Sequence, residues 1–248
     1  IDAHYDLFDM PEGSVKTFLE ELKEKNISGI NITVPYKEIA YEFVKTNGVI
    51  DPYADKVGAI NTIVVEDDSL YGYNTDGTGF MRSVFEDMGF DITDKKVVLI
   101  GAGGGAKACA VKIAKRCKKL SIIDLVTEKA EELALKLNNI YNTNIFFVCK
   151  TDEEKKHALE EAHFIVNATA CGRDGKSFPF DEKLLRKNMC VYDLIYDPIM
   201  TPLLTAAQAK GCKVSNGLNM LLYQGAEAFT LWTQKQAPIE IMRKALLL

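Results

Sequence analysis

Hydrophobic residues follow two different spacings along the chain, and their alternation predicts an α/β protein. Residues 15–22 carry apolar side chains at helical spacing behind Ser14, which can cap a first helix. Residues 30–34 form a short apolar run of the strand type. Further strands are expected at 59–65, 70–73, 97–100, 120–123, 145–148, 164–167, 191–194 and 213–215, and further helices at 38–45, 77–88, 106–115, 128–138, 218–232 and 238–247.

The order of these elements predicts two domains. A small α/β unit ends near Asn74, and strands and helices then alternate in the way that is typical of a doubly wound parallel sheet. We expect the last two helices to return to the first unit through a hinge at Gly217. The predicted substrate-binding, catalytic domain is therefore 1–76 with 217–248, and the predicted Rossmann-type dinucleotide-binding domain is 77–216, with a cleft between them. The chain starts at Ile1 close to the first helix, so we expect an opening strand to be missing.

Composition narrows the classes of function. The 248 residues are 47% hydrophobic, and a net charge of −5 is spread over interleaved acidic and basic residues, which does not favour nucleic acid or a membrane surface as a partner. We expect a cytoplasmic protein that acts on a small molecule, as a monomer or a homodimer. The six cysteines lack Cys-x-x-Cys spacing and the three histidines lack the spacing of helical metal ligands, so we expect reduced thiols and no metal.

A glycine-rich turn at 101–106 lies between an expected strand and an expected helix. Gly101, Gly103 and Ala106 fit the G-x-G-x-x-A form, and Gly104 adds backbone freedom between them. Such a turn brings backbone N–H groups close to a pyrophosphate at the positive end of a helix. The alternative is a plain glycine-rich loop between a strand and a helix.

Asp124 follows the next expected strand, at the separation where a carboxylate binds the ribose hydroxyls of NAD. Leu125 cannot pair with the 2′-phosphate of NADP, and the carboxylate would repel that phosphate. The sequence therefore predicts NAD or NADP as cofactor and favours NAD. Lys107 and Lys129 lie close enough to Asp124 in sequence to weaken the preference for NAD over NADP. Asp124 could instead be a turn or helix-capping residue.

Two residues can perform acid–base chemistry. Lys37 follows an apolar strand and a proline turn, and Asp76 lies in a second polar cluster at 74–79. A lysine held beside a carboxylate can hydrogen-bond an alkoxide oxygen and relay its proton. Asn31, Thr33, Asn61 and Asn74 could supply neutral hydrogen bonds to a polyhydroxylated substrate. The alternative is that Lys37 is a surface residue and Asp76 caps a helix.

Several segments resemble the shikimate dehydrogenase family, which includes the quinate/shikimate dehydrogenases. The resemblance spans almost the whole chain. It rests on Asn31-Ile32-Thr33-Val34-Pro35-Tyr36-Lys37, Gly58-Ala59-Ile60-Asn61-Thr62, Asn74-Thr75-Asp76-Gly77-Thr78-Gly79, the glycine turn, Asn167-Ala168-Thr169, Asp193-Leu194-Ile195-Tyr196, Thr201-Pro202-Leu203, Asn216-Gly217-Leu218-Asn219-Met220 and Gln224-Gly225-Ala226.

The resemblance implies an NAD(P)-dependent enzyme that reversibly reduces 3-dehydroshikimate to shikimate, a polyhydroxylated ring carboxylate, in the biosynthesis of aromatic amino acids. It makes Lys37 and Asp76 the catalytic pair. It implies that the substrate contacts are Thr33, Asn61, Tyr196 and Gln224. The cofactor contacts that it adds to the glycine turn and Asp124 are Ala168, Thr169, Gly217 and Met220, the last two near the nicotinamide.

Three departures from the family pattern leave other functions open. A Ser-x-Ser motif that anchors the substrate carboxylate is absent from the sequence, Asp124-Leu125-Val126 replaces the Asn-Arg-Thr of NADP-using members, and Ala170-Cys171-Gly172-Arg173 replaces a Gly-Met ending. The second of these also suits an NAD-dependent quinate dehydrogenase that oxidises quinate to 3-dehydroquinate. A relative that binds NAD without catalysis is the second alternative.

Overall fold

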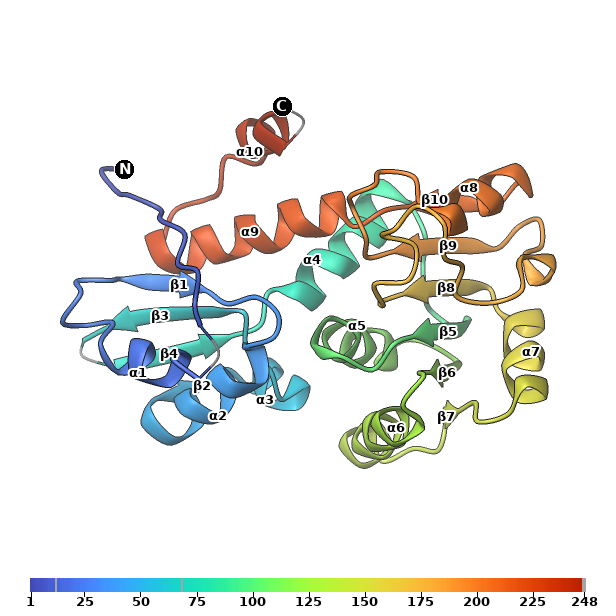
Figure 1. The fold of residues 1–248 in the computed structure, drawn as a ribbon, viewed down its shortest axis with the longest axis horizontal. Helices are drawn as coiled ribbons and strands as arrows, with labels where there is room; N and C mark the ends of the chain where they lie inside the picture. The colour runs from blue at the N-terminus through green and yellow to red at the C-terminus, as the bar shows by residue number, and fades with distance from the viewer. Residues whose placement is uncertain (12, 68, 247–248) are drawn as a thin grey trace. The chain divides into compact units, whose positions relative to one another are not determined.

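The computed structural model describes residues 1–11, 13–67 and 69–246, and the chain forms two compact units, Ile1–Asn74 and Thr75–Leu248 (Figure 1). The predicted turn at Asp67 and Asp68 lies partly outside the described residues, as does Leu247, the predicted end of the last helix. The class of the fold is α/β, as the hydrophobic pattern predicted.

The first unit is built on a mixed sheet of four strands in the order β1-β3-β4-β2. β1 and β4 both run antiparallel to β3, and β2 runs parallel to β4. Buried apolar residues of helices and strands form one core under this sheet. The elements are α1 (Val15–Glu20), β1 (Gly29–Asn31), α2 (Lys37–Asn47), β2 (Val49–Ile50), α3 (Pro52–Val57), β3 (Thr62–Glu66) and β4 (Ser69–Tyr73).

Two helix starts in this unit differ from the prediction. Ser14 precedes α1 as expected, but its hydroxyl donates to the carbonyl of Pro11 at 2.8 Å and does not cap the helix. The helix α3 was not predicted, although Asp51 accepts hydrogen bonds from two of its first amides, Pro52 opens it and Gly58 ends it in a left-handed conformation. These are ordinary start and stop signals, and the helix between them was too short for its hydrophobic spacing to be recognised.

The second unit is built on a parallel sheet of six strands in the order β10-β9-β8-β5-β6-β7. Its strands are β5 (Lys96–Ile100), β6 (Lys119–Ile123), β7 (Phe146–Val148), β8 (Phe164–Asn167), β9 (Cys190–Asp193) and β10 (Lys213–Ser215). Its helices are α4 (Asp76–Arg82), η1 (Ser83–Asp87), α5 (Gly104–Ala114), α6 (Thr127–Tyr141), α7 (Asp152–Glu161), η2 (Glu182–Leu184), α8 (Pro202–Ala209), α9 (Leu218–Thr233) and α10 (Ile239–Leu246). This is the doubly wound sheet that the sequence predicted.

Helices pack on both faces of this sheet (Figure 1). On one face, residues of α7 and α8 such as Leu159 and Leu204 pack against Ile165 and Val191 of the strands. On the other face, Phe80 of α4 makes ring contacts with aromatic residues of β8 and β9. The strands are therefore buried on both sides, which explains their continuous apolar runs.

The predicted helix at 77–88 consists of two pieces. α4 is an ordinary helix, and η1 continues it as a π-helix, which widens the turn near the buried Ser83. α7 and α8 were not predicted. α7 has few apolar residues, and its strongest signal is the capping box made by Thr151 and Glu154.

α9 packs closely on α4 within the second unit. A Cβ atom at Gly79 would lie 2.7 Å from the carbonyl oxygen of Met220, so the two helix backbones can approach only because this residue is glycine. α10 is attached to α9 through Arg243, which donates to Asn219 at 2.7 Å and to Tyr223 at 3.1 Å. The assignment of 217–248 to the substrate domain stays a prediction.

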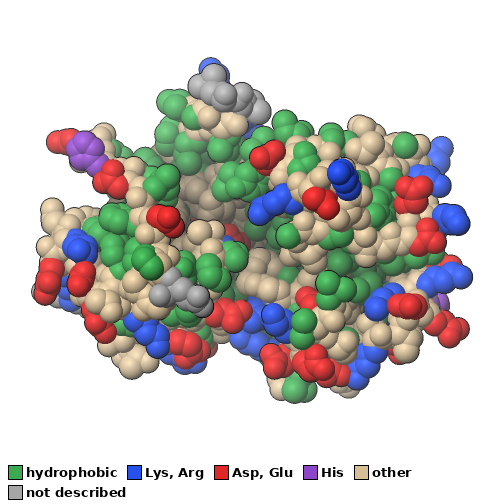
Figure 2. Space-filling model, viewed as in Figure 1, with side chains coloured by type: hydrophobic (Ala, Val, Ile, Leu, Met, Phe, Trp, Pro, Cys, Tyr) green, Lys and Arg blue, Asp and Glu red, His purple; other side chains and the backbone are tan. Residues whose placement is uncertain are grey.

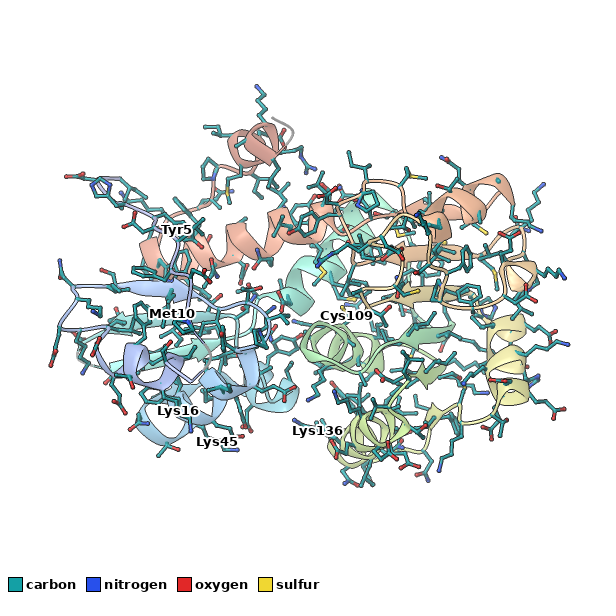
Figure 3. All side chains as sticks on the ribbon, in the orientation of Figure 1. Tyr5, Met10, Lys16, Lys45, Cys109 and Lys136 are labelled. Atoms are coloured by element: carbon teal, nitrogen blue, oxygen red, sulfur yellow. The ribbon has the colours of Figure 1, made fainter. Side chains whose placement is uncertain are left out.

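Charges and cysteines agree with the small-molecule interpretation. On the face seen in Figure 2, acidic and basic side chains are interspersed over both units. The six cysteines form no disulfide with one another, and five of them are buried, including Cys109 of α5, which is labelled in Figure 3. Within the ranges that the structure describes, no helix has the length and apolar character needed to cross a bilayer, and no group of three possible metal ligands occurs.

Candidate functional site

The carboxyl ends of the parallel strands in the second unit bring together most of the predicted cofactor residues. β5 pairs with β6 on one side and with β8 on the other, so the strand order changes direction beside β5. Open α/β sheets bind their ligands at such a position. The loops that meet there follow β5, β6, β8, β9 and β10 and contain Gly101, Asp124, Ala168, Tyr196 and Gly217.

The glycine turn has the geometry of a phosphate cradle. Gly101 has φ +108°, and a Cβ atom there would lie 3.0 Å from the carbonyl oxygen of Ala168, so this position requires glycine. Gly103 precedes α5 and is exposed, and a Cβ atom there would meet nothing within 4 Å. Gly104 begins the helix, and Ala106 is buried in its first turn. Open space beside the amides of a helix start is what a pyrophosphate needs.

Asp124 connects the glycine turn to the end of β6. One carboxylate oxygen accepts a hydrogen bond from the backbone N–H of Ala102 at 2.7 Å, and the other accepts one from Val126 at 2.8 Å. The carboxylate is half-buried, and each oxygen retains a second lone pair for a ribose hydroxyl. Leu125 beside it is fully exposed, at 103% of its reference area. Asp124 thus forms a turn, which was the alternative interpretation, and still faces solvent.

The loop after β8 uses its polar groups internally. The hydroxyl of Thr169 donates to Asn167 Oδ1 at 2.7 Å and accepts from the backbone N–H of Cys171 at 3.1 Å. Its methyl group packs against Gly101. If Thr169 contacts a cofactor, it therefore presents backbone and methyl surface, while its hydroxyl shapes the loop.

A buried carboxylate ends β9, and no role of its own was predicted for it from the sequence. Asp193 is wholly buried and accepts hydrogen bonds from Asn167 Nδ2 at 3.0 Å, Thr201 Oγ1 at 2.7 Å and the N–H of Ile195 at 3.1 Å. Burial raises the pKa of Asp193, although these hydrogen bonds favour its ionised form. Its place at the carboxyl end of a parallel strand, close to that of Asp124, was a signal that could have identified it.

The loops after β9 and β10 touch each other at Gly217. A Cβ atom there would lie 2.0 Å from the carbonyl oxygen of Leu194, and the Gly217 N–H donates to Ile195 O at 3.1 Å. Met220, one turn further along α9, is buried at 9% exposure. Gly217 is therefore required for packing, and a role for it or Met220 beside a nicotinamide stays a prediction.

A pocket of about 360 Å³ opens between the loops after β8 and β9, lined by Arg173, Tyr196, Asp197 and Pro198. Tyr196 is 42% exposed, so its ring and hydroxyl are available to a ligand. Arg173 comes from the segment whose sequence departs from the family pattern. The pocket places a cation, a phenol and a carboxylate around one space.

In the first unit, the structure places Lys37 beside the segment that carries Asn61. Lys37 is the first residue of α2 and is half-buried, and its carbonyl accepts a hydrogen bond from Ile60 N at 3.0 Å. Asn61 is buried, and its Oδ1 accepts from the Thr62 hydroxyl at 3.0 Å. Thr33 lies exposed in the turn before α2. The proline turn therefore presents Lys37 at a helix start.

In the second unit, Asp76 and Gln224 lie near each other. Asp76 is the first residue of α4 and is 5% exposed. Thr75, which precedes it, has its hydroxyl 3.4 Å from Gln224 Oε1, and Gln224 also donates to Leu221 O. Thr75 takes the cap position and the buried Asp76 is the first helical residue, so Asp76 does not cap α4 as the alternative interpretation proposed. Lys37 and Asp76 belong to different units, and their pairing remains a proposal.

Two asparagines that could have contacted a substrate have structural partners. Asn31 donates to Asn61 O at 3.1 Å and to Thr62 Oγ1 at 3.2 Å, and its Oδ1 accepts from the hydroxyl of Tyr5, which is labelled in Figure 3. Asn74 donates to Ala59 O at 3.0 Å. Both amides fasten β-strands and turns of the first unit. The prediction that they are substrate donors finds no support in these contacts.

The nucleotide edge of the second unit defines the class of this protein. A Cβ at Gly101 would press against Ala168, the space at Gly103 is open, and an acidic residue follows the neighbouring strand, so these residues fit a dinucleotide. A separate unit then carries a lysine beside a buried asparagine. This is the class of nicotinamide-dependent oxidoreductases.

Comparison with known proteins gives the family. The model of the shikimate dehydrogenase substrate-binding domain matches residues 1–63, and that of the shikimate 5′-dehydrogenase C-terminal domain matches residues 217–247. The shikimate dehydrogenase (NADP+) of Moorella thermoacetica is 40% identical over 98% of this chain and 82% of its own length. The enzyme of the same name from Methanococcoides burtonii is 35% identical over 100% of this chain and 87% of its own. The chain belongs to the shikimate dehydrogenase family.

Solved structures agree with this membership. Shikimate 5-dehydrogenase from Listeria monocytogenes, in complex with shikimate and NAD, is 32% identical with a TM-score of 0.84, over 96% of this chain and 84% of its own. Quinate dehydrogenase from Corynebacterium glutamicum, in complex with NAD, is 32% identical with a TM-score of 0.86, over 94% of this chain and 82% of its own. The family resemblance and the fold class that the sequence predicted are confirmed.

Proposed function

We propose that this protein reversibly reduces 3-dehydroshikimate to shikimate with a nicotinamide cofactor. The observation that carries the proposal has two parts. The glycine turn of the second unit fits a dinucleotide, and Lys37 begins α2 next to the segment that contains Asn61. The relatives named shikimate dehydrogenase, which match nearly the whole chain, support the same reaction.

Lys37 and Asp76 are the proposed catalytic pair. The Lys37 ammonium would donate a hydrogen bond to the oxygen of the reacting carbon and stabilise negative charge there. In reduction it would pass a proton to that oxygen, and in oxidation it would accept one, while Asp76 keeps the lysine charged and oriented. Asn61, Thr33, Gln224 and Tyr196 would bind the remaining hydroxyls and the carboxylate of the substrate.

The residues proposed to hold the cofactor lie along the sheet edge. Amides of the glycine turn would bind the pyrophosphate, and Asp124 would bind the ribose. The nicotinamide end would be contacted by Ala168, Thr169, Gly217 and Met220. The nicotinamide, when bound, supplies or accepts the hydride. The part of the protein is to exclude water and to hold the two reacting carbons close together.

We further propose a preference for NAD over NADP. The Asp124 carboxylate faces solvent after β6 with Leu125 fully exposed beside it, so a 2′-phosphate would meet a negative charge and an apolar side chain. The named relatives use NADP, and the Listeria structure contains NAD, so family membership alone supports either cofactor.

Quinate is the second candidate substrate. The likeness to the NAD complex of quinate dehydrogenase from Corynebacterium glutamicum supports it, as does the Asp124-Leu125 pair that favours NAD. Both are polyhydroxylated ring carboxylates, so they present the same kinds of hydrogen-bonding group to a pocket.

Initial rates with shikimate or quinate and NAD or NADP, in all four combinations, test these proposals. We expect the highest kcat/KM with shikimate and NAD. A higher value with quinate would make the protein a quinate dehydrogenase, and a higher value with NADP would overturn the cofactor preference. Binding of NADH without turnover in any combination would favour the non-catalytic alternative.

Lys37→Ala tests the catalytic pair. Loss of a positioned proton donor typically costs 10²–10⁴-fold in kcat, so we expect a fall of roughly that size with NADH affinity unchanged. Lys45→Ala removes a lysine from the other end of the same helix and should leave kcat unchanged. If Lys37→Ala instead weakens NADH binding at normal kcat, the lysine belongs to the fold or to the cofactor site.

A further inference from the structure

A single buried network fastens the end of β8 to the end of β9. Its centre is Asp193, whose two carboxylate oxygens accept hydrogen bonds from Asn167 and Thr201 and from the N–H of Ile195. Thr201 also caps α8, since its hydroxyl accepts from Leu204 N at 3.3 Å. The carboxylate therefore joins the last residue of one strand, its own loop and the start of a helix.

Asn167 carries the network into the loop after β8. Its Nδ2 donates both to Asp193 and to Cys171 O at 3.0 Å, while its Oδ1 accepts from the N–H of Thr169 at 3.2 Å and from the hydroxyl of Thr169. The four hydrogen-bonding positions of the amide are thus occupied. Across the described ranges, no buried side-chain nitrogen or oxygen lacks a partner.

The two loops also touch outside this network. Gly172 has φ +105°, and a Cβ atom there would lie 3.5 Å from the Cβ of Thr201. The backbone N–H of Leu194 donates to Asn167 O at 2.9 Å. The network also connects the loops through a charge, and a carboxylate can accept all three of these hydrogen bonds without needing to donate one.

Both fastened loops carry groups that face a ligand. Arg173 and Tyr196 both line the pocket between the loops, and Ala168 and Thr169 border the glycine turn. Asp193 itself has no exposed surface, so it cannot touch a ligand. Any effect it has on binding or turnover must pass through the loops that it holds.

We propose that Asp193 is a positioning residue that sets the spacing between the loop of Thr169 and the loop of Tyr196, so that nicotinamide and substrate meet in reacting geometry. This inference rests on the proposed dehydrogenase function. The sheet alone places the strand ends, and the network determines how the loops leave them. A misplacement of about 1 Å at a reacting centre can cost on the order of 10²-fold in rate.

The variants Asp193→Ala and Asp193→Asn test whether the hydrogen bonds of this side chain, and not its volume alone, position the two loops. In Asp193→Asn, the new amide oxygen can keep the hydrogen bonds from Asn167 and Ile195. The new amide nitrogen can donate to the hydroxyl of Thr201, which accepts as well as donates. We expect kcat/KM for shikimate to fall on the order of 10²-fold in Asp193→Ala and to be largely restored in Asp193→Asn. Calorimetric affinity for ADP-ribose, which lacks the nicotinamide, should be unchanged in both.

Two further variants keep the test decisive if Asp193→Ala does not fold. Thr201→Val removes one donor to the carboxylate and should lower kcat/KM, whereas Thr201→Ser retains the hydroxyl and should not. Leu159→Ala removes packing from α7 in the core on the same face of the sheet, without touching the network. It should lower the melting temperature and leave kcat/KM unchanged.

Hydrogen exchange gives a measurement that does not depend on turnover. We expect Asp193→Ala to lose protection in 168–173 and 194–201 together, with 97–100 unaffected. Equal kinetic losses in Leu159→Ala and Asp193→Ala, or a stability loss in Asp193→Ala at unchanged kcat/KM, would overturn the inference. An inactive wild-type protein would refute the proposed function, while coupled loss of protection in the two loops would still show that Asp193 holds them.

Discussion

Asp124 lies directly after β6 and Asp193 is the last residue of β9, at the same edge of one sheet, yet their surroundings differ. Asp124 is half-buried and accepts hydrogen bonds from two backbone amides, beside an exposed Leu125. Asp193 is wholly buried, and two of its three donors are side chains. The same residue type near the ends of two strands is therefore partly open to solvent in one case and closed off by the fold in the other.

Solvent access is what separates the two carboxylates. A carboxylate that faces water can take a ribose hydroxyl as one more partner at little cost, because water already fills that place. A carboxylate without water must have all its hydrogen bonds from the protein, and burial raises the pKa of Asp193 even so. The network around Asp193 is the compensation for burying its charge.

Two glycines repeat this contrast. Gly103, on the Asp124 side, has open space where a Cβ would stand, whereas Gly217, on the Asp193 side, leaves 2.0 Å between that position and a backbone oxygen. The space beside the first glycine is open, and the second glycine makes room for the chain itself. Substitutions at the two positions should therefore fail in different ways.

Gly217→Ala is expected to have the largest effect. Its methyl group would overlap Leu194 O, a backbone atom that cannot move without disturbing β9 and its loop. We expect a loss of at least about 3 kcal/mol in the free energy of unfolding and a fall of roughly 10 °C in melting temperature. A stable Gly217→Ala protein, by thermal denaturation, would show that the loops are not held as closely as described.

Leu125→Arg tests whether the side of the comparison that contains Asp124 determines the choice between NAD and NADP. The side chain is fully exposed, so the change costs no packing, and it supplies the cation that a 2′-phosphate needs. We expect the ratio of kcat/KM with NADP to that with NAD to rise about tenfold, the value of one charged hydrogen bond. Leu135→Arg adds the same charge at another exposed position of the same region and should leave the ratio unchanged.

Gly103→Ala should leave the fold nearly intact and weaken the cofactor. Alanine is a poorer residue than glycine before a helix, so a cost below about 1 kcal/mol in stability is expected. The methyl group would occupy the open space of the cradle, and we expect the dissociation constant of NADH to rise about tenfold, or 1.4 kcal/mol, by fluorescence titration. Unchanged NADH affinity would place the pyrophosphate elsewhere.

Asp174 is a third carboxylate for the comparison and is exposed to solvent. Its substitution should have the smallest effect. Hydrogen bonds from Ser177 and Lys176 lower its pKa from 3.8 to about 2. Because the pKa is lower in the folded state than in the unfolded state, the ionised carboxylate adds to the free energy of unfolding at pH values above the unfolded-state pKa. That contribution is lost as the pH falls from about 4 to 2. Asp174→Asn should therefore lower the urea midpoint at pH 7, with a difference from wild type that shrinks below pH 4.

Asp6→Asn in the exposed N-terminal segment provides the matched control for Asp174→Asn. It removes one exposed carboxylate outside that turn and should leave the urea midpoint unchanged across the same pH range. A difference between wild type and Asp174→Asn that stays constant down to pH 2.5 would show that the turn gains nothing from the ionised form.

Much of the second unit could be predicted from local pattern. Strands buried on both faces have continuous apolar runs, so β5, β6 and β8 were found within one residue of their bounds. α7 was missed because only a narrow stripe of it, with Ala158 and Leu159, is buried. The glycine turn was recognisable because its conformation at Gly101 excludes other residues.

The sequence named candidate site residues but could not give their hydrogen-bond partners. Asn31 and Asn74 were expected to face a substrate, and the structure uses their amides to hold strands and turns of the first unit. Thr169 was expected at the cofactor, and its hydroxyl is engaged by Asn167. An amide or hydroxyl has the same appearance in sequence whether it serves a ligand or a loop.

The sequence by itself determined the class of the fold, the position of the dinucleotide turn and the family, because these depend on hydrophobic spacing and on short motifs with a local conformation. Tertiary structure alone decided which carboxylate is buried and which glycine is indispensable. Burial and close approach are properties of segments far apart in the chain, as with Asn167, Asp193 and Thr201. No local pattern can contain them, since each depends on where the other strands and helices finally pack.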